Sequence, residues 1–472
     1  MGYLYIQITQ IKGDSIMQKT RKEFANQYIN PKIDIKDNRY KSEIIYHNEN
    51  DEELFSYKKF VEALKHTCEI RCYGEIYLVY NYKTGLSDEL NVRGLSRLLK
   101  EILDCVDTRF WNSKTESKII ELIDRDFDEV KKIPVYEDYI FLDNGIYDIH
   151  TKKLEEYSPK IIAVKKINNV YNTNAKCPIF LQFINDCMCG DQDLIKCIQE
   201  IMGYVLIDNN KAQKFFLFYG IGSNGKSVLC DVIINMMGRD NISSLSIKQI
   251  KGNFTPSCIV GKKANISSEN EADFETEKLK AITSGDIMTI DVKYAQPYDY
   301  RPTCKMIFAT NNLPNTCDNS HGFYRRLIII PFNRVFKEHE QDVNLIDKLI
   351  EEREGILMWS LEGLHRLIEN NYKFTESEIV KSVIRSYKDS QDPVYMFFRE
   401  NMNEERDNRI KRKEILERYV FWAAQNTIHT KGTDNSNKFW NELRRVSMME
   451  GIHIQETKSK NDRFIKHLGW KA

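Results

Sequence analysis

Apolar and polar residues alternate with different periods along the chain of 472 residues, and these periods predict its elements. Residues 1–50 are mostly polar and rich in Asn, Lys and Asp, which predicts irregular structure. Within residues 53–135, the run EIYLVYNY is typical of a strand, and LSRLLKEILDCV has apolar residues at helical spacing. In residues 139–159, short apolar runs flank Asp-Asn-Gly and Thr-Lys-Lys, which indicates a hairpin.

The pattern becomes helical in the segments IFLQFINDCM and DLIKCIQEIMGYVLI, which follow this hairpin. From about residue 211 to 332, strand-like and helical runs alternate, as an α/β nucleotide-binding domain requires. Residues 347–387 have a helical period. The segment from about residue 392 combines short helices with a final strand-like run, RFIKHLGW.

Composition limits the class of protein. The length suggests several domains, and 42% hydrophobic residues suffice for buried cores. Lys+Arg and Asp+Glu are each 69, so no histone-like coat of positive charge is expected, although a local basic channel is compatible with this balance. Residues 401–472 are the exception, because they carry more basic than acidic residues.

No apolar run approaches the ~20 residues that span a bilayer, and the first residues resemble neither a secretory signal nor a myristoylation site, where Ile6 replaces Ser or Thr. The 11 cysteines lack the spacing of a zinc site, which favours reduced thiols. We therefore expect a cytoplasmic protein of a bacterial host that does not contact membranes.

One loop predicts phosphate chemistry. The run GIGSNGKS (Gly220–Ser227) matches G-x-x-x-x-G-K-S and lies between a strand-like KFFLFY and a helical SVLCDVIINMM. Backbone N–H groups of the loop would surround the phosphates of ATP at the start of a helix. Lys226 would neutralise the β- and γ-phosphate oxygens, and Ser227 would bind Mg²⁺. The predicted ATP-binding residues are Gly220, Gly222, Ser223, Asn224, Gly225, Lys226 and Ser227.

Two polar positions downstream could complete this site. The run SSENE places Ser268 and Glu269 at the end of a possible strand, where a carboxylate can polarise water and help to hold Mg²⁺. An ordinary acidic loop is an equally good interpretation of the local sequence. Asn311 ends the run KMIFATN, where its amide would reach both the γ-phosphate and the attacking water.

The runs IMTIDVKY and RPTCKMIFAT flank a turn that contains Pro297, which predicts a hairpin with Lys293 and Tyr294 near its tip. A cation beside an aromatic ring suits a DNA backbone and a base. A solvated lysine beside a packed tyrosine explains the same residues. Arg325 and Arg326 precede the apolar run LIIIPF, either as a paired strand entry or as arginine fingers that stabilise the transferring phosphoryl group.

The motifs GIGSNGKS, SSENE, LKAITSGD, KMIFATNNLP and GFYRRLIIIPF, in this order, resemble the superfamily III helicases, of the phage and plasmid type found with primases and akin to poxvirus replicative NTPases. The resemblance covers roughly residues 138–332. It implies an AAA+-like ATPase that forms a hexameric ring and moves 3′–5′ on single-stranded DNA. Glu269 would be the catalytic acid, Asn311 the sensor, Arg326 or Arg325 the finger, and Lys293 with Tyr294 the pore hairpin. Ser268 departs from the family, which often has an acid there.

The C-terminal segment resembles the winged-helix DNA-binding units of this family. Five of its cations would contact phosphates, namely Lys411, Arg412, Lys413, Arg444 and Arg445. Charged faces of a packing domain are an equally good interpretation.

The predicted fold is an α/β protein with an AAA+-like core, a helical N-terminal collar and a winged-helix-like C-terminal domain. The predicted divisions are a poorly defined α/β region, partly disordered (1–137), a helical leader (138–210), the ATPase core (211–335), a helical lid (336–390) and the DNA-binding domain (391–472).

The predicted function is an ATP- and Mg²⁺-dependent DNA helicase that replicates a phage, plasmid or integrated element, with single-stranded and forked DNA, further copies of itself, and replication proteins of the element or host as partners. The dense acid run Asp124, Asp126, Asp128 lies in a helical pattern, so we expect no priming activity. A primase-helicase, an origin-binding initiator and another AAA+ NTPase, such as a packaging ATPase, are the alternatives. The guanine-specific motif Asn-Lys-x-Asp is absent from the sequence, which disfavours a GTPase.

Overall fold

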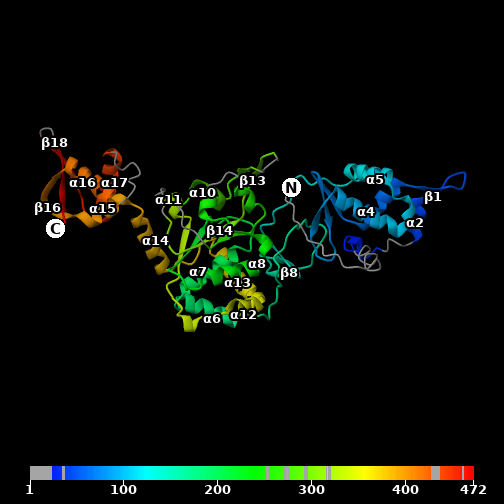
Figure 1. Cartoon of the computed structure of the whole chain (residues 1–472), viewed down its shortest axis with the longest axis horizontal. Helices are drawn as coiled ribbons and strands as arrows, with labels where there is room; N and C mark the ends of the chain where they lie inside the picture. Colours follow the sequence, from blue (N-terminus) through cyan, green and yellow to red (C-terminus); the bar gives the residue numbers. More distant parts are fainter. Residues whose placement is uncertain are drawn as a thin grey trace. The chain divides into compact units, whose positions relative to one another are not determined.

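A computed structural model describes residues 24–33, 38–250, 255–268, 274, 276–291, 296–314, 316, 320–426, 436–459 and 462–471. Contacts within the chain divide it into two compact units, one ending at Tyr171 and the other beginning at Asn172 (Figure 1).

The N-terminal unit is a mixed α/β structure. Its first part contains α2 (Asn38–Ile44), β1 (Ile45–His47), β2 (Glu53–Phe55), α3 (Tyr57–Thr67), β3 (Ile70–Tyr73), β4 (Ile76–Tyr80), β5 (Ser87–Asn91), α4 (Val92–Val106), the 3₁₀ turn η1 (Thr108–Phe110) and α5 (Ser113–Asp126). Strands β3, β4 and β5 form an antiparallel sheet, as EIYLVYNY predicted for β4. Side-chain caps from Ser56, Asn91 and Asn112 start α3, α4 and α5.

The prediction of irregular structure up to residue 50 is wrong for α2 and β1, because Ile44 and Ile45 are buried in the core of this unit.

The predicted hairpin after residue 138 is confirmed. Strands β6 (Tyr139–Leu142), β7 (Gly145–Asp148) and β8 (Lys153–Glu155) form an antiparallel sheet.

The acid run Asp124, Asp126, Asp128 is exposed, as expected. Asp124 and Asp126 lie in the last turn of α5, and Asp128 follows its end.

A parallel sheet of five strands forms the centre of the second unit. Its strands are β9 (Phe215–Tyr219), β10 (Ile242–Ser243), β11 (Ala264–Ser267), β14 (Lys305–Thr310) and β15 (Leu327–Pro331), in the spatial order β10-β11-β14-β9-β15. All residues of β14 and β15 are buried, which is the pattern of a parallel sheet covered on both faces. The expected α/β core is therefore present. Since β9 lies between β14 and β15, the carboxyl ends of these three strands meet at one edge.

Helices and turns connect these strands. They are α8 (Lys226–Met237), η2 (Arg239–Asn241), α9 (Ile247–Ile250), η3 (Thr255–Ile259), α10 (Thr276–Ser284) and α11 (His321–Tyr324). The hairpin expected from IMTIDVKY and RPTCKMIFAT has a different second strand. β12 (Met288–Ile290) pairs with β13 (Tyr298–Tyr300), whereas KMIFAT is β14 of the central sheet. The reason is burial, because a strand whose residues are all buried belongs to the core and not to an exposed ribbon. Lys293 and Tyr294 lie outside the described residues.

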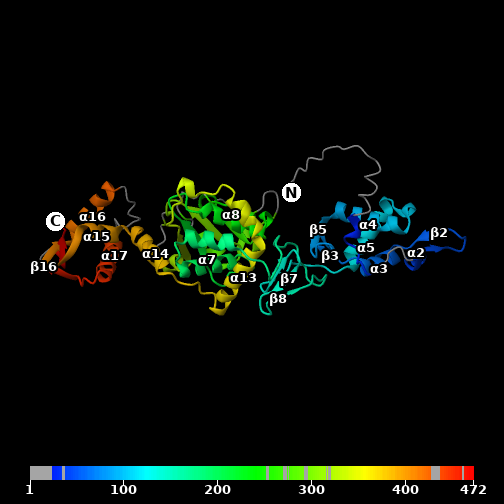
Figure 2. The same ribbon diagram turned by 90° about the horizontal axis from the view of Figure 1, so that it is seen from below.

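The helices before and after the sheet pack together. They are α6 (Pro178–Cys187) and α7 (Gln192–Tyr204) on one side of the sequence, and η4 (Glu338–Glu340), α12 (Leu345–Glu351), α13 (Arg353–Glu369) and α14 (Glu378–Ser390) on the other. Helices α7 and α13 lie side by side (Figure 2), and a Cβ atom on Gly203 would come within 2.5 Å of the Leu364 nitrogen.

Glu200 on α7 joins this helix pair to the chain that follows it. Its carboxylate is fully buried and accepts hydrogen bonds from Arg366 Nε (2.8 Å) and from the Thr375 nitrogen and hydroxyl (2.6 Å each). A buried carboxylate is tolerated when it is paired with a cation and hydrogen-bonded in this way. The segments predicted as separate leader and lid thus share one interface.

The C-terminal module begins with α15 (Pro393–Asn401) and continues through β16 (Met402–Lys411), α16 (Arg412–Gln425), α17 (Ser436–Met449), β17 (Gln455–Ser459) and β18 (Asp462–Trp470). Its antiparallel sheet has the order β16-β18-β17. The strand RFIKHLGW is confirmed as part of β18. Strands β16 and β17 were missed because their residues are mostly exposed and polar. The module has its own core, which includes Phe397, Tyr419 and Phe439.

Candidate nucleotide-binding site

The glycine loop (Gly220–Gly225) connects the end of β9 to the start of α8. Gly222, Ser223 and Gly225 have φ angles of 105°, 45° and 88°, in the region that favours glycine. At Gly220, an added Cβ atom would overlap the Asn224 amide nitrogen and lie 2.6 Å from the Phe332 oxygen. The loop is therefore a tight cradle whose backbone groups precede a helix N-terminus, which is the geometry of an anion site.

Lys226 is the buried cation of this cradle. Its side chain is 6% exposed, and its Nζ atom donates to the Gly220 oxygen (2.6 Å), Asn224 Oδ1 (3.0 Å) and Asn311 Oδ1 (3.2 Å). These three acceptors are neutral, and Lys226 has no carboxylate partner among the described residues. Burial lowers the pKa of Lys226. A buried cation with only neutral partners keeps an uncompensated charge that favours a bound anion.

The neighbouring strand ends hold the loop in place. The Gly220 nitrogen donates to the Thr310 oxygen (3.2 Å) at the end of β14, and Asn224 Nδ2 donates to the Phe332 oxygen (3.3 Å) after β15. The predicted sensor, Asn311, is brought to Lys226 because it directly follows β14. The sequence motif contained no sign of the contact to Phe332, which lies far along the chain.

A cavity of about 630 Å³ opens beside the glycine loop. Its mostly apolar wall comes from α6, α8 and the chain after β15, and it is lined by Pro178, Ile179, Gln182, Phe183, Asp186, Ser223, Gly225, Val228, Phe336, Glu340, Gln341, Asp342 and Leu345. The chain after β15 is fixed to the loop, since the Phe336 nitrogen donates to the Ser223 oxygen (2.8 Å). This cavity could not be predicted from the sequence, because its residues have no motif of their own.

The predicted metal-binding positions are only partly described. Ser227 is exposed in the first turn of α8, and Ser268 is exposed directly after β11. Glu269 lies outside the described residues. Within the described part of the chain, no group of three or more His, Cys, Asp or Glu residues could hold a metal ion.

The arginine pair lies at the other edge of the sheet. Leu327, the residue after the pair, is in register with Phe215 at the start of β9, whereas the glycine loop follows the end of β9. At about 3.3 Å per residue, a strand of this length separates the two edges by roughly 13–17 Å. Arg325 and Arg326 therefore lie well away from the glycine loop of their own chain.

The two arginines differ in their partners. Arg326 donates to Ser284 Oγ through Nε (3.1 Å) and Nη2 (2.7 Å), and to the Gly322 oxygen (2.6 Å) through Nη1. Burial lowers the pKa of Arg326, and the charge of Arg325 lowers it further. Arg325 is exposed, and its guanidinium has no hydrogen bond or ion pair to any described residue. Arg325 is thus the freer of the two.

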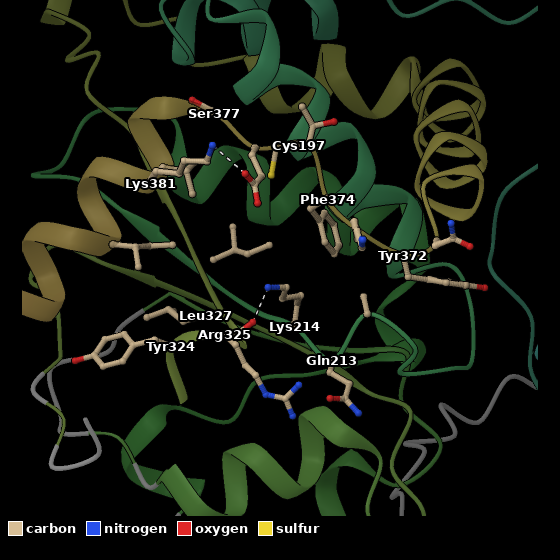
Figure 3. A pocket seen from close by; sticks show the side chains of 18 of the residues that line it. Cys197, Gln213, Lys214, Tyr324, Arg325, Leu327, Tyr372, Phe374, Ser377 and Lys381 are labelled. Atoms are coloured by element: carbon tan, nitrogen blue, oxygen red, sulfur yellow. Dashed lines mark hydrogen bonds and ion pairs between the residues drawn. The ribbon is translucent and has the colours of Figure 1, made fainter. Parts of the chain in front are cut away.

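Arg325 lines a second pocket, of about 460 Å³ (Figure 3). Lys214 also lines this pocket and donates to the Arg325 backbone oxygen (2.5 Å), and burial lowers the pKa of Lys214. On the far wall, Lys381 of α14 pairs with Glu376 (2.9 Å). Of these cations, Lys381 is compensated by carboxylates, because Glu378 also pairs with it.

The five cations predicted to contact DNA in the C-terminal module are all engaged with carboxylates. Arg412 pairs with Glu456 (3.1 Å) and lies over the Trp440 ring, and Arg444 shares Glu456. The other pairs are Lys411 with Asp462 (2.8 Å), Lys413 with Glu417 (3.7 Å), and Arg445 with Glu442 (2.6 Å) and Asp392. These pairs match the packing interpretation of the cations at least as well as the DNA-binding one.

Two family models match parts of the chain. Residues 38–189 match a model described as D5 N terminal like, and residues 218–326 match DUF5906, a family of unknown function. The second match includes the glycine loop, Asn311 and the arginine pair.

Two viral proteins are similar to this chain. A putative helicase, L207/L206, of Acanthamoeba polyphaga mimivirus is 27% identical over 167 residues, which are 34% of this chain and 17% of that protein. Putative helicase 184R of Invertebrate iridescent virus 6 is 25% identical over 230 residues, 43% of this chain and 23% of that protein. The chain thus spans about a fifth of the length of the curated relatives that it matches.

Among solved structures, two apo structures of the NrS-1 C-terminal region are similar. The A form has a TM-score of 0.49 and 12% identity, and covers 86% of this chain and 98% of that one. The structure of residues 305–718 has a TM-score of 0.46 and 13% identity, with coverages of 87% and 98%. Across the described residues, no helix is both long and apolar enough to cross a membrane.

Proposed function

We propose that this chain is an ATP-dependent DNA helicase of the superfamily III type, which acts in the replication of a phage, virus, plasmid or integrated element. The observation that carries the proposal is the contact of Lys226 with both Asn224 of the glycine loop and Asn311 after β14. This arrangement joins a phosphate-binding cation to a residue that can orient water. The names of the two viral relatives support the choice of a helicase among NTPases.

The cradle fits a nucleoside triphosphate. The loop amides and Lys226 would hold the β- and γ-phosphates, and the apolar cavity, whose volume lies within the usual range for ligand sites, would take the base beside Phe183 and Phe336. The exposed hydroxyl of Ser227 and the carboxylate of Glu269 would hold Mg²⁺, which neutralises charge on the transferring phosphoryl group. Because Mg²⁺ keeps several waters and phosphate oxygens as ligands, a dense cluster of carboxylates is not required.

In hydrolysis, Asn311 would orient the attacking water while Glu269 accepts its proton. Arg325 or Arg326 would act on the nucleotide of a neighbouring copy, because the sheet keeps them far from their own glycine loop. The exposed Arg325 is the better candidate for direct contact, with Arg326 holding the end of α11. Supply of a finger by a neighbour favours a closed ring, for which the family resemblance implies six subunits and 3′–5′ movement.

The C-terminal module is proposed to bind DNA. Its element order α15-β16-α16-α17-β17-β18 supports the winged-helix interpretation. Since the cations predicted from the sequence are paired, we assign phosphate contact first to Lys458 and Arg463, which are exposed and in register across the β17–β18 hairpin. Neither has an ion pair to a described residue.

The test is ATP hydrolysis with and without single-stranded DNA, for the wild-type chain, for Lys226→Ala and for Lys196→Ala, whose lysine is exposed on α7. We expect DNA to stimulate the wild type and the Lys196 control, and Lys226→Ala to be inactive. Hydrolysis that DNA does not change would argue against a helicase. Strand displacement by Lys226→Ala would overturn the site assignment.

A further inference from the structure

Helix α14 presents one face to the central parallel sheet. Val380, Ile384, Tyr387 and Gln391 recur at the spacing of a single helical face, the last of them one residue past the end of α14. Val383 and Ile384 pack in the same cluster as Leu313 and Ile329, and Tyr387 is a buried member of this cluster. The face therefore covers β15 and the chain that follows Asn311.

Two side chains of this face hold the backbone after Asn311. The buried hydroxyl of Tyr387 donates to the Pro314 oxygen, and Gln391 Oε1 accepts from the Thr316 nitrogen (2.9 Å). Pro314, Thr316, Tyr387 and Gln391 are all buried. Because so few residues separate Pro314 from Asn311, a movement of Pro314 cannot be absorbed by slack in the chain.

The same helix contacts the arginine pair. Lys388 Nζ lies 5.5 Å from the centre of the Tyr324 ring, and the rings of Tyr324 and Tyr387 are 6.3 Å apart in an edge-on arrangement. Tyr324 directly precedes Arg325. Near the start of α14, Ser377 and Lys381 line the pocket beside Arg325 (Figure 3). One helix thus contacts the neighbours of both Asn311 and Arg325.

The far end of α14 enters the C-terminal module directly. Asp392, the residue after Gln391, caps α15 by accepting from the Val394 and Tyr395 nitrogens (3.0 and 3.1 Å). Its other carboxylate oxygen pairs with Arg445 on α17. Gln391 therefore binds the segment after Asn311, and the adjacent Asp392 caps the first helix of the C-terminal module.

We propose that α14 transmits the state of the C-terminal module to the hydrolytic site, with Tyr387 and Gln391 as positioning residues for Asn311. DNA that binds the module would shift α14, and the shift would reach Asn311 through Pro314 and Thr316. The inference rests on the proposed function, because it presumes that Asn311 takes part in hydrolysis. The competing explanation is that these hydrogen bonds only stabilise the fold.

The experiment compares Gln391→Leu, which removes the acceptor, with Gln391→Glu, which keeps it. In the full chain, kcat and KM for ATP are measured with and without saturating single-stranded DNA. We expect Gln391→Leu to lower kcat and the DNA stimulation several-fold with an unchanged KM. Gln391→Glu buries a charge but keeps the acceptor, so it should retain more of the DNA stimulation than Gln391→Leu. Tyr387→Phe, which loses only the hydroxyl, should act in the same direction as Gln391→Leu.

Two outcomes are distinguishable. If the wild type hydrolyses ATP with DNA stimulation, and Gln391→Leu shows the same kcat and stimulation with only a lower Tm, the inference is overturned and the proposed function stands. If the wild type shows no ATP hydrolysis, the proposed function is overturned, and the inference with it.

Discussion

Lys226 Nζ lies 3.2 Å from Asn311 Oδ1, so a helix start and a strand end that are distant in sequence meet at one cation. The contact depends on the strand order, because β14, which ends next to Asn311, is the direct neighbour of β9. The Asn311 amide provides one of the neutral acceptors that hold the buried lysine. A γ-phosphate would replace this contact and release the amide toward water.

Asn311→Ala should therefore affect hydrolysis more than binding. Removal of one preorganised polar group from a reacting centre typically costs about 10²–10³-fold in kcat. We expect a loss of at least tenfold in kcat, with the affinity for a fluorescent ATP analogue changed less than threefold. Asn312→Ala is the matched control, since Asn312 is exposed beside it. Equal kinetics for the two variants would contradict the role of Asn311.

The charge of Lys226 predicts a pH dependence. Burial lowers the pKa of Lys226 below the ordinary value of 10.5. The charged form is thus lost at a lower pH than for a free lysine, and affinity for the nucleotide should fall as pH rises through this lowered pKa. Binding of the ATP analogue, titrated toward alkaline pH, measures the fall. Lys226→Arg should bind with a flatter profile, because arginine does not deprotonate.

The lowered pKa of Lys226 also makes the free energy of unfolding depend on pH. A lysine with a lowered pKa binds fewer protons in the folded than in the unfolded chain at pH values between the two pKa values, so its contribution to the free energy of unfolding rises with pH in that window. The contributions to nucleotide binding and to stability therefore change in opposite directions with pH.

Much of this site could be predicted from local sequence. The glycine loop, its strand and its helix are specified by adjacent residues, and Asn311 ends an apolar run that any parallel sheet would bury. The C-terminal cations could not be interpreted in this way. The partner of Arg412 and Arg444 is Glu456, on a strand whose exposed residues gave no strand signal.

The place of β14 in the central sheet could also not be predicted from local sequence alone. Both IMTIDVKY and KMIFAT are strand-like, and only the register with β9 and β11 assigns the second to the central sheet. The contacts of α14 with Pro314 and Thr316 are of the same kind, because their hydrogen bonds join a side chain to a backbone more than 70 residues away. The sequence of α14 shows only its helical periodicity and does not indicate which distant backbone groups it binds.

Glu200→Ala should destabilise the second unit. It leaves the partly exposed Arg366 without its carboxylate and the partly buried Thr375 nitrogen without its acceptor, and a hydrogen-bonding group left unsatisfied in this way costs about 1–3 kcal/mol. We expect a clear fall in the midpoint of thermal unfolding of this unit. Glu378→Ala, at an 87% exposed side chain, should leave the midpoint unchanged. An unchanged midpoint for Glu200→Ala would show that the helix pair is held by packing alone.

Arg325→Ala should abolish most hydrolysis without loss of nucleotide binding, because its guanidinium has no described partner within the chain and is proposed to act on a neighbour. Arg326→Ala should in addition lower the thermal midpoint, since Ser284 and Gly322 lose their donor. Mixing either variant with Glu269→Gln should restore part of the activity, as mixed rings contain some intact sites. Mixtures that never recover would contradict action between subunits.

DNA binding by the C-terminal module can be tested with paired and unpaired cations. Each phosphate contact on duplex DNA contributes about −0.9 to the slope of log K against log salt. Replacement of Lys458 and Arg463 by alanine should therefore weaken binding to forked DNA and make the slope less steep by about 1–2. Lys413→Ala removes a cation that pairs with Glu417 on the same helix, and we expect little change in the slope. The reverse result, a larger effect from Lys413→Ala, would move the DNA contact from the β17–β18 hairpin to α16.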